Sequence, residues 1–96
     1  VADPSADLPA ARHEGEALVQ GLAACLPCDL RLGALRRADF LRVFKGFRFV
    51  HFAGHADAAG EGPGGLRLID GHVGGADLRA LGGGTAPALF FANACR

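Results

Sequence analysis

The stretch FRFVHFAGHA, from Phe47 to Ala56, decides the fold of this chain. Its aromatic and β-branched residues from Phe47 to Ala53 predict a buried strand. Gly54 is expected to break that strand, because glycine inside a strand pattern often marks an interruption. A histidine, His55, follows at once, so this segment delivers an imidazole to the end of a strand.

A second apolar run, PALFFANACR, from Pro87 to Arg96, has the same organisation. It predicts a strand over Ala88 to Ala92, with Cys95 just beyond it. A Cys–His hydrolase needs an imidazole that deprotonates the sulfur and later protonates the leaving amine. The two strand ends therefore make His55 and Cys95 a candidate dyad.

Two amphipathic helices are predicted in the part of the chain that precedes both strands. Residues Leu8 to Leu22 have apolar side chains at helical spacing, with Pro9 in the first turn and an end near Cys25. Residues Arg36 to Lys45 repeat this spacing, and Gly46 supplies a C-terminal stop. Helices alternating with strands are typical of an α/β fold.

Shorter elements fill the remaining segments. We expect a strand tail at VADP, a short edge strand at Cys28–Gly33, a loop at Ala56–Gly65, a hairpin at Leu66–Val73 around Asp70-Gly71, and a short helix at Asp77–Leu81. This order predicts parallel pairing with right-handed crossovers. Ligands bind beyond the carboxyl ends of such strands, where the predicted dyad is expected to lie in loops.

Composition limits the classes of function. The chain has 96 residues, ten basic and ten acidic, which indicates a single small domain without a field for nucleic acid. Its apolar stretches are short and its first residues lack a signal-peptide pattern, so we expect no membrane segment and a soluble, cytoplasmic protein. Three cysteines do not suggest a disulfide scaffold. Nine Arg against one Lys, with 15 Gly, indicate a GC-rich bacterial genome.

Both ends of the sequence look cut. The chain starts at Val1 rather than at methionine, and it stops one residue after Cys95, where a helix would normally follow. We therefore expect a fragment of a longer protein whose remaining residues complete the sheet and the substrate pocket.

The motifs FVHFAGHA, GLRLIDG, DLRAL and ALFFANACR, preceded by ADPSADLPAARHEGEAL, resemble the CHAT domain. This is a caspase-like and separase-like module that is often attached to tetratricopeptide repeats in bacteria. The resemblance runs from about Ala2 to the last residue. It implies a caspase-like three-layer α/β sandwich with a mostly parallel sheet, incomplete at both ends, so that residues 1–96 form one partial domain without an internal boundary.

The same resemblance implies roles for individual residues. Cys95 would be the nucleophile and His55 the general base of a cysteine endopeptidase that acts on a protein or peptide substrate through a thioester acyl-enzyme. The oxyanion would be bound by the backbone N–H groups of Cys95 and Ala56, although relatives usually have glycine where this chain has Ala56. No cofactor is implied. Tetratricopeptide-repeat or sensor regions of the parent chain are the implied partners, and the 96-residue piece alone is expected to be inactive.

Two other classes of function stay open at this point. One is a non-catalytic CHAT module that acts as a scaffold or interaction domain, which the Ala56 departure would favour. The other is a metal-binding domain built on His51, His55 and the pair Cys25 and Cys28. The H-x-x-x-H spacing joins two imidazoles on a helix rather than on a strand, and a C-x-x-C pair that follows a helix is a weak redox or zinc signal. We therefore expect no metal site.

The neighbours of the dyad have structural interpretations. His51 alternates with Phe47 and Phe49, which places it on a face of the predicted strand, where we expect it to form a stabilising hydrogen bond. Asp57 lies close to His55 in sequence and is expected to influence its protonation. The two cysteines of the C-x-x-C pair are expected to pack in the interior.

Overall fold

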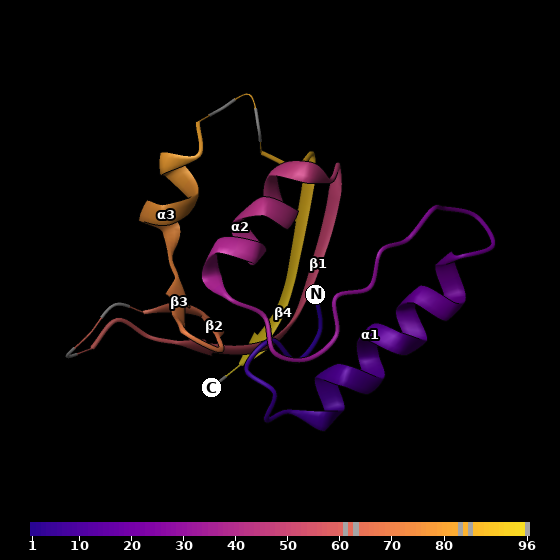
Figure 1. The fold of residues 1–96 in the computed structure, drawn as a ribbon, viewed down its shortest axis with the longest axis horizontal. Helices are drawn as coiled ribbons and strands as arrows, with labels where there is room; N and C mark the ends of the chain where they lie inside the picture. The colour runs from indigo at the N-terminus through magenta and orange to yellow at the C-terminus, as the bar shows by residue number, and fades with distance from the viewer. Residues whose placement is uncertain (61, 63, 83, 85, 96) are drawn as a thin grey trace.

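The computed structural model describes residues 1–60, 62, 64–82, 84 and 86–95, without the side chain of Cys95. Three helices and four strands follow one another along the chain (Figure 1). They are α1 (Pro9–Leu22), α2 (Arg37–Gly46), β1 (Phe49–Asp57), β2 (Gly65–Leu68), β3 (Gly71–Val73), α3 (Gly75–Ala80) and β4 (Leu89–Cys95). The predicted helices, the hairpin and the two long strands are therefore present, with small shifts at their ends.

The four strands form one sheet in the order β3-β2-β1-β4. Strand β4 pairs parallel to β1, whereas β2 pairs antiparallel to both β1 and β3. The sheet is thus mixed, and the expectation of a mostly parallel sheet was wrong. The reason is the length of the connections: residues 58–64 are too few for a parallel crossover, while residues 58–88, which include the hairpin and α3, suffice to bring β4 parallel to β1.

The N-terminal segment forms a short parallel pairing with β1, on the side of β1 that also pairs with β2. Ala2 forms isolated bridges with Leu32 and Ala53. The backbone N–H of Ala53 donates to Val1 O, and the N–H of Asp3 donates to Ala53 O, each at 2.9 Å. The start of the chain thus behaves as the predicted strand tail, but the predicted strand Cys28–Gly33 is reduced to the one bridge at Leu32.

One face of the β1–β4 pair is packed against α2. Phe40 and Phe52 are fully buried there, and their rings meet edge to face with centroids 5.8 Å apart. Phe44 and Phe90 extend the cluster with a second edge-to-face contact at 5.2 Å. Such aromatic contacts add to the stabilisation from burial, so this cluster is the core of the domain.

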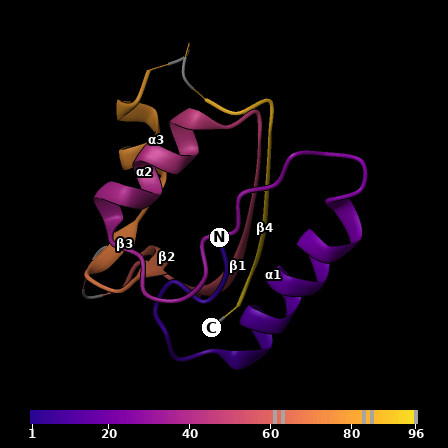
Figure 2. The same cartoon turned by 45° about the vertical axis from the view of Figure 1, so that its right-hand side comes forward.

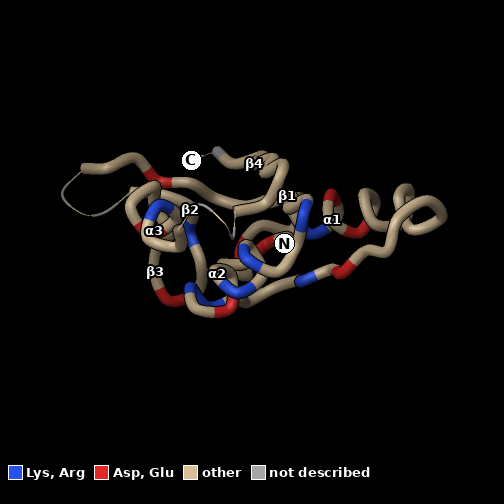
Figure 3. The backbone as a smooth tube through the Cα atoms, turned by 90° about the horizontal axis from the view of Figure 1, so that it is seen from above, with Lys and Arg blue, Asp and Glu red and all other residues tan. Residues whose placement is uncertain are grey.

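The other face of the β1–β4 pair looks toward α1. Figure 2 shows the two strands between α2 and α1. Residues alternate between the faces of a strand, so Phe49, His51 and His55 share the α1 face. The β1–β4 pair therefore has α2 on one face and α1 on the other, which gives three layers in the order helix, sheet and helix. Figure 3 shows acidic and basic residues interspersed along the chain, as the balanced composition predicts.

Gly54 does not end β1, which continues to Asp57. A Cβ atom at Gly54 would lie 3.0 Å from Pro4 Cδ and 3.1 Å from the ring of Phe52. These separations are tighter than ordinary van der Waals contact. Glycine at this position thus allows Pro4 and Phe52 to pack closely against β1, and it does not mark a chain break.

Candidate functional site

The backbone register brings the two predicted dyad positions together. His55 and Cys95 are Cα partners on the parallel strands β1 and β4, and among the described residues this is the last paired position of that ladder toward the carboxyl ends. Paired positions on adjacent strands lie about 4.8 Å apart in the hydrogen-bonding direction. Both residues lie inside strands, so the expectation of loop positions was wrong. The side chain of Cys95 lies outside the described residues.

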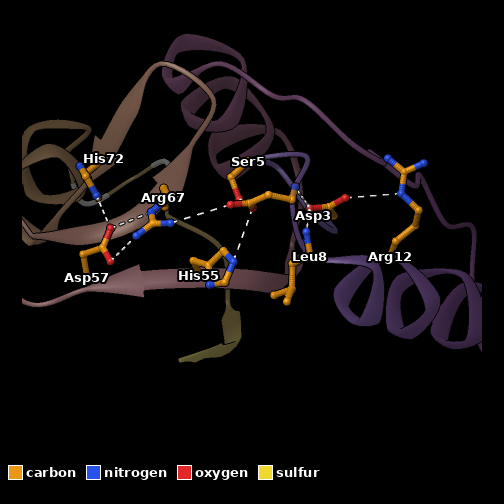
Figure 4. A network of polar contacts seen from close by, with 9 residues as sticks. Asp3, Ser5, Leu8, Arg12, His55, Asp57, Arg67 and His72 are labelled. Atoms are coloured by element: carbon orange, nitrogen blue, oxygen red, sulfur yellow. Dashed lines mark hydrogen bonds and ion pairs between the residues drawn. The ribbon is translucent and has the colours of Figure 1, made fainter. Parts of the chain in front are cut away.

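His55 is partnered by a carboxylate that comes from the start of the chain. Its Nε2 atom lies 3.5 Å from Asp7 Oδ1, and its side chain is 19% exposed. The aspartate that the sequence suggested, Asp57, contacts other groups instead: it forms an ion pair with Arg67 and a hydrogen bond with His72 (Figure 4). The residue that stands beside the imidazole is therefore Asp7.

The loop that carries Asp7 is held by a buried carboxylate. Asp3, only 3% exposed, accepts hydrogen bonds from the backbone N–H groups of Asp7 at 2.9 Å and Leu8 at 2.8 Å. It also forms an ion pair with Arg12 at 3.4 Å. Because the backbone N–H of Asp3 donates a hydrogen bond to Ala53 O, this loop is held against β1 beside the candidate site.

A second group of charges lies along the antiparallel side of β1. The guanidinium of Arg67 donates two hydrogen bonds to Asp57, at 2.8 and 2.7 Å, and His72 Nε2 lies 2.6 Å from the same carboxylate. The hydrogen bonds from Arg67 and then His72 lower the pKa of Asp57 from 3.8 to about 2. Asp57 is therefore ionised throughout the physiological pH range, and it anchors the β2–β3 hairpin to β1.

Ala56 occupies an ordinary strand position. It pairs with Leu66 on β2. Among the described residues, the non-glycine positions with positive φ are Asp3 and Ala6, so the backbone at Ala56 lies outside the left-handed region that favours glycine. Alanine at this position therefore imposes no backbone strain.

His51 has the structural role that the sequence predicted. Its Nε2 atom lies 2.9 Å from Glu14 Oε1 on α1, and its ring stacks on Phe91 with centroids 5.2 Å apart. The other oxygen of Glu14 accepts a hydrogen bond from Asn93 at 2.8 Å. Glu14 thus links α1 to both β1 and β4 on the face that carries His55.

The other histidine and cysteine residues that the sequence singled out do not come together in one site. Cys25 and Cys28 are both exposed, so the expectation that they pack in the interior was wrong. They follow α1 in a connection that leaves the core, which explains their exposure. In the part of the chain that the structure describes, no group of three or more His, Cys, Asp or Glu side chains could hold a metal ion. His51 and His55 turn to different carboxylates.

An apolar groove of about 540 Å³ runs between α1 and the exposed part of the strand face. Its lining includes Leu18, Leu22, Phe49, Leu89 and Phe91, each of which is an exposed large hydrophobic residue. The groove also reaches His51. It lies over the paired positions Phe49 and Leu89, where the β1–β4 ladder begins, whereas His55 and Cys95 pair where it ends.

Sequence reasoning missed the site residues Asp7, Arg67 and His72. Arg67 and His72 are register partners in the hairpin that the Asp70-Gly71 turn predicts, so this turn could have placed them side by side. Asp7 carries no comparable local signal, because it reaches His55 only through the fold of the N-terminal segment.

Comparisons of the chain with models of protein families, with curated proteins and with solved structures give no match. Within the described residues, none of the helices has both the length and the apolar character needed to cross a bilayer.

Proposed function

We propose that this chain carries the Cys–His dyad of a CHAT-type, caspase-like cysteine peptidase, with Cys95 as nucleophile and His55 as general base and then acid. One observation carries the proposal: the two residues are register partners at the carboxyl ends of adjacent parallel strands. A site of this kind requires a thiol and an imidazole within reach of one another. The motifs HFAGHA and ANACR supply the resemblance in sequence.

The proposed reaction is hydrolysis of a peptide bond in two stages. His55 accepts the proton of the Cys95 thiol, and the thiolate adds to the substrate carbonyl. The C–N bond then breaks as the imidazolium gives that proton to the leaving amine, and a thioester remains on Cys95. Water attacks the thioester while His55 accepts its proton, so the acid is released and the thiolate returns.

The oxyanion of each tetrahedral intermediate requires backbone donors. We assign these to the N–H groups of Cys95 and Ala56. The backbone at Ala56 is ordinary strand, so its methyl group forces no unusual φ at this position.

The test isolates one thiol. The chain has three cysteines, and the exposed Cys25 and Cys28 can be replaced by serine, which leaves Cys95 alone. In this background we expect alkylation of Cys95 by iodoacetamide at pH 6.5 to be faster than alkylation of an ordinary thiol. We expect His55→Ala to slow it about tenfold, because a neighbouring imidazole raises the thiolate fraction.

His51→Ala is the matched control, because His51 lies on the same face of the same strand and is also paired with a carboxylate. It should leave the alkylation rate of Cys95 nearly unchanged. Equal rates in the His55→Ala variant and its parent background would contradict the proposed dyad.

The second candidate function is a non-catalytic CHAT module that binds another protein. The apolar groove favours it, because exposed apolar patches of this kind are common at interaction sites. An unactivated Cys95 in the alkylation experiment would support this candidate over the peptidase.

A further inference from the structure

The carboxylate of Asp7 stands between the candidate base and an arginine. Its Oδ1 atom lies 3.5 Å from His55 Nε2, and its Oδ2 atom lies 3.9 Å from Arg67 Nη1 (Figure 4). An ionised carboxylate can only accept hydrogen bonds. The nitrogen of His55 that faces Asp7 is therefore favoured as the N–H of the neutral ring, and the lone pair is left on Nδ1.

The side chain of Asp7 is 51% exposed, but its backbone is held in place by the fold. The backbone N–H of Asp7 donates a hydrogen bond to the buried carboxylate of Asp3. The backbone N–H of Asp3 donates in turn to the carbonyl oxygen of Ala53 on β1. The hydroxyl of Ser5 donates a hydrogen bond to Asp7 Oδ1. Asp7 is thus tied to the strand that carries His55 by short connections.

Arg67 does not compete closely with His55 for the carboxylate of Asp7. Its guanidinium is held by Asp57 at 2.7 and 2.8 Å, compared with 3.9 Å to Asp7. His55 therefore forms its ion pair with Asp7 from the N-terminal loop, and the charge of Arg67 is taken up mainly by Asp57.

We propose that Asp7 is the positioning residue of His55, a third member that turns the dyad into a Cys95–His55–Asp7 triad; this rests on the proposed function. Asp7 holds the proton on Nε2 and fixes the ring, so that Nδ1 receives the proton of the Cys95 thiol. The S–H bond breaks, the Nδ1–H bond forms, and the imidazolium is stabilised by Asp7 until Nδ1 returns the proton to the leaving amine. Such an orienting carboxylate supplies the correct tautomer without being protonated itself.

The tautomer is measured directly on the ¹⁵N-histidine-labelled chain. Long-range ¹H–¹⁵N spectra at about pH 8, where imidazoles are mostly neutral, distinguish Nε2–H from Nδ1–H. We expect His55 to carry its proton mainly on Nε2 in the wild type, and Asp7→Asn to shift a large part of it to Nδ1. Asp39→Asn, which removes the same charge from an exposed pair with Arg42 on α2, should leave the tautomer unchanged. A wild-type His55 that carries its proton mainly on Nδ1 would overturn the proposal, and this result needs no variant.

The alkylation rate of Cys95 in the background without Cys25 and Cys28 separates this inference from the proposed function. We expect Asp7→Asn to slow alkylation about tenfold, because it removes the negative charge that faces His55 Nε2 at 3.5 Å, and Asp7→Glu to recover part of the loss. If His55→Ala slows the reaction and Asp7→Asn does not, the triad is refuted while the dyad stands. If neither variant slows it, the proposed function itself fails.

Discussion

The two faces of the β1–β4 pair are built in different ways. On the α2 face, Phe40 and Phe52 are 0% exposed and their rings interlock. On the α1 face, Leu89 and Phe91 remain 58% and 57% exposed, and contact with the helix runs through the polar side chain of Glu14. Stability thus comes mainly from one face, whereas His55 lies on the other. The candidate site is supported by the core without being part of it.

The largest expected effect tests this division with two phenylalanines. Phe40→Ala should lower the free energy of unfolding by about 3–5 kcal/mol, because it removes a fully buried ring from a close-packed cluster. Phe91→Ala should cost no more than about 1 kcal/mol, mainly through its stacking on His51. Urea unfolding followed by circular dichroism measures both changes.

Phe40→Leu keeps this comparison measurable if the alanine variant does not fold. It should still cost more than Phe91→Ala, because it leaves part of a cavity in the core. Equal losses of unfolding free energy at Phe40 and Phe91 would mean that both faces of the β1–β4 pair contribute equally to stability.

A smaller effect tests how closely α1 is packed against the rest of the chain. A methyl group at Gly15 would collide with Ala2 Cβ and lie 3.3 Å from Leu30 Cδ1, whereas one at Gly21 would meet nothing within 4 Å. Both glycines lie in α1. We expect Gly15→Ala to destabilise the protein by about 1–3 kcal/mol through overpacking. Gly21→Ala should stabilise it by about 0.5–1 kcal/mol through helix propensity.

Thermal unfolding of the two variants gives the answer with each serving as the control of the other. A stabilising Gly15→Ala would show that α1 can move away from Ala2 at little cost. Polar contacts such as those of Glu14 and Arg12 would then matter more for α1 than close packing, and the contrast with the α2 face would be even sharper.

The sequence predicted elements better than it predicted how they pair. Apolar spacing identified α1, α2 and both long strands, because periodicity follows directly from burial of one face. The hairpin followed from the local chemistry of Asp70-Gly71. The mixed sheet was missed, because the prediction followed the alternating order of elements and not the connection over residues 58–64, which is too short for a parallel crossover.

The candidate site was predicted in part for the same reason. His55 and Cys95 were found because each follows an apolar strand pattern. They are paired because the parallel register that aligns Phe49 with Leu89 also aligns His55 with Cys95. Gly54 was misread because its function is to make room for Pro4 and Phe52, a contact between distant parts of the chain. Asp7 was missed because only the N-terminal pairing with β1 brings it to His55.

The smallest expected effect concerns pH and the charged end of β1. Hydrogen bonds from Arg67 and His72 lower the pKa of Asp57 to about 2, against about 3.8 without these partners. A carboxylate whose pKa is lower in the folded state stabilises the fold above its unfolded pKa, and this contribution is lost as pH falls through the folded pKa. The contribution of Asp57 is therefore complete above about pH 4 and disappears between about pH 4 and pH 2.

Thermal unfolding midpoints between pH 5 and pH 2 test this in the wild type and in Asp57→Asn. The two proteins should differ most at pH 5 and converge at pH 2, because protonation of Asp57 then weakens the same contacts that the substitution removes. Asp39→Asn, which breaks the exposed helical pair with Arg42, is the matched control and should shift the midpoint little at any pH. Equal midpoints for wild type and Asp57→Asn at pH 5 would mean that packing of the hairpin, rather than this ion pair, holds β2 to β1. The charged end of β1 would then resemble the α2 face more than the α1 face.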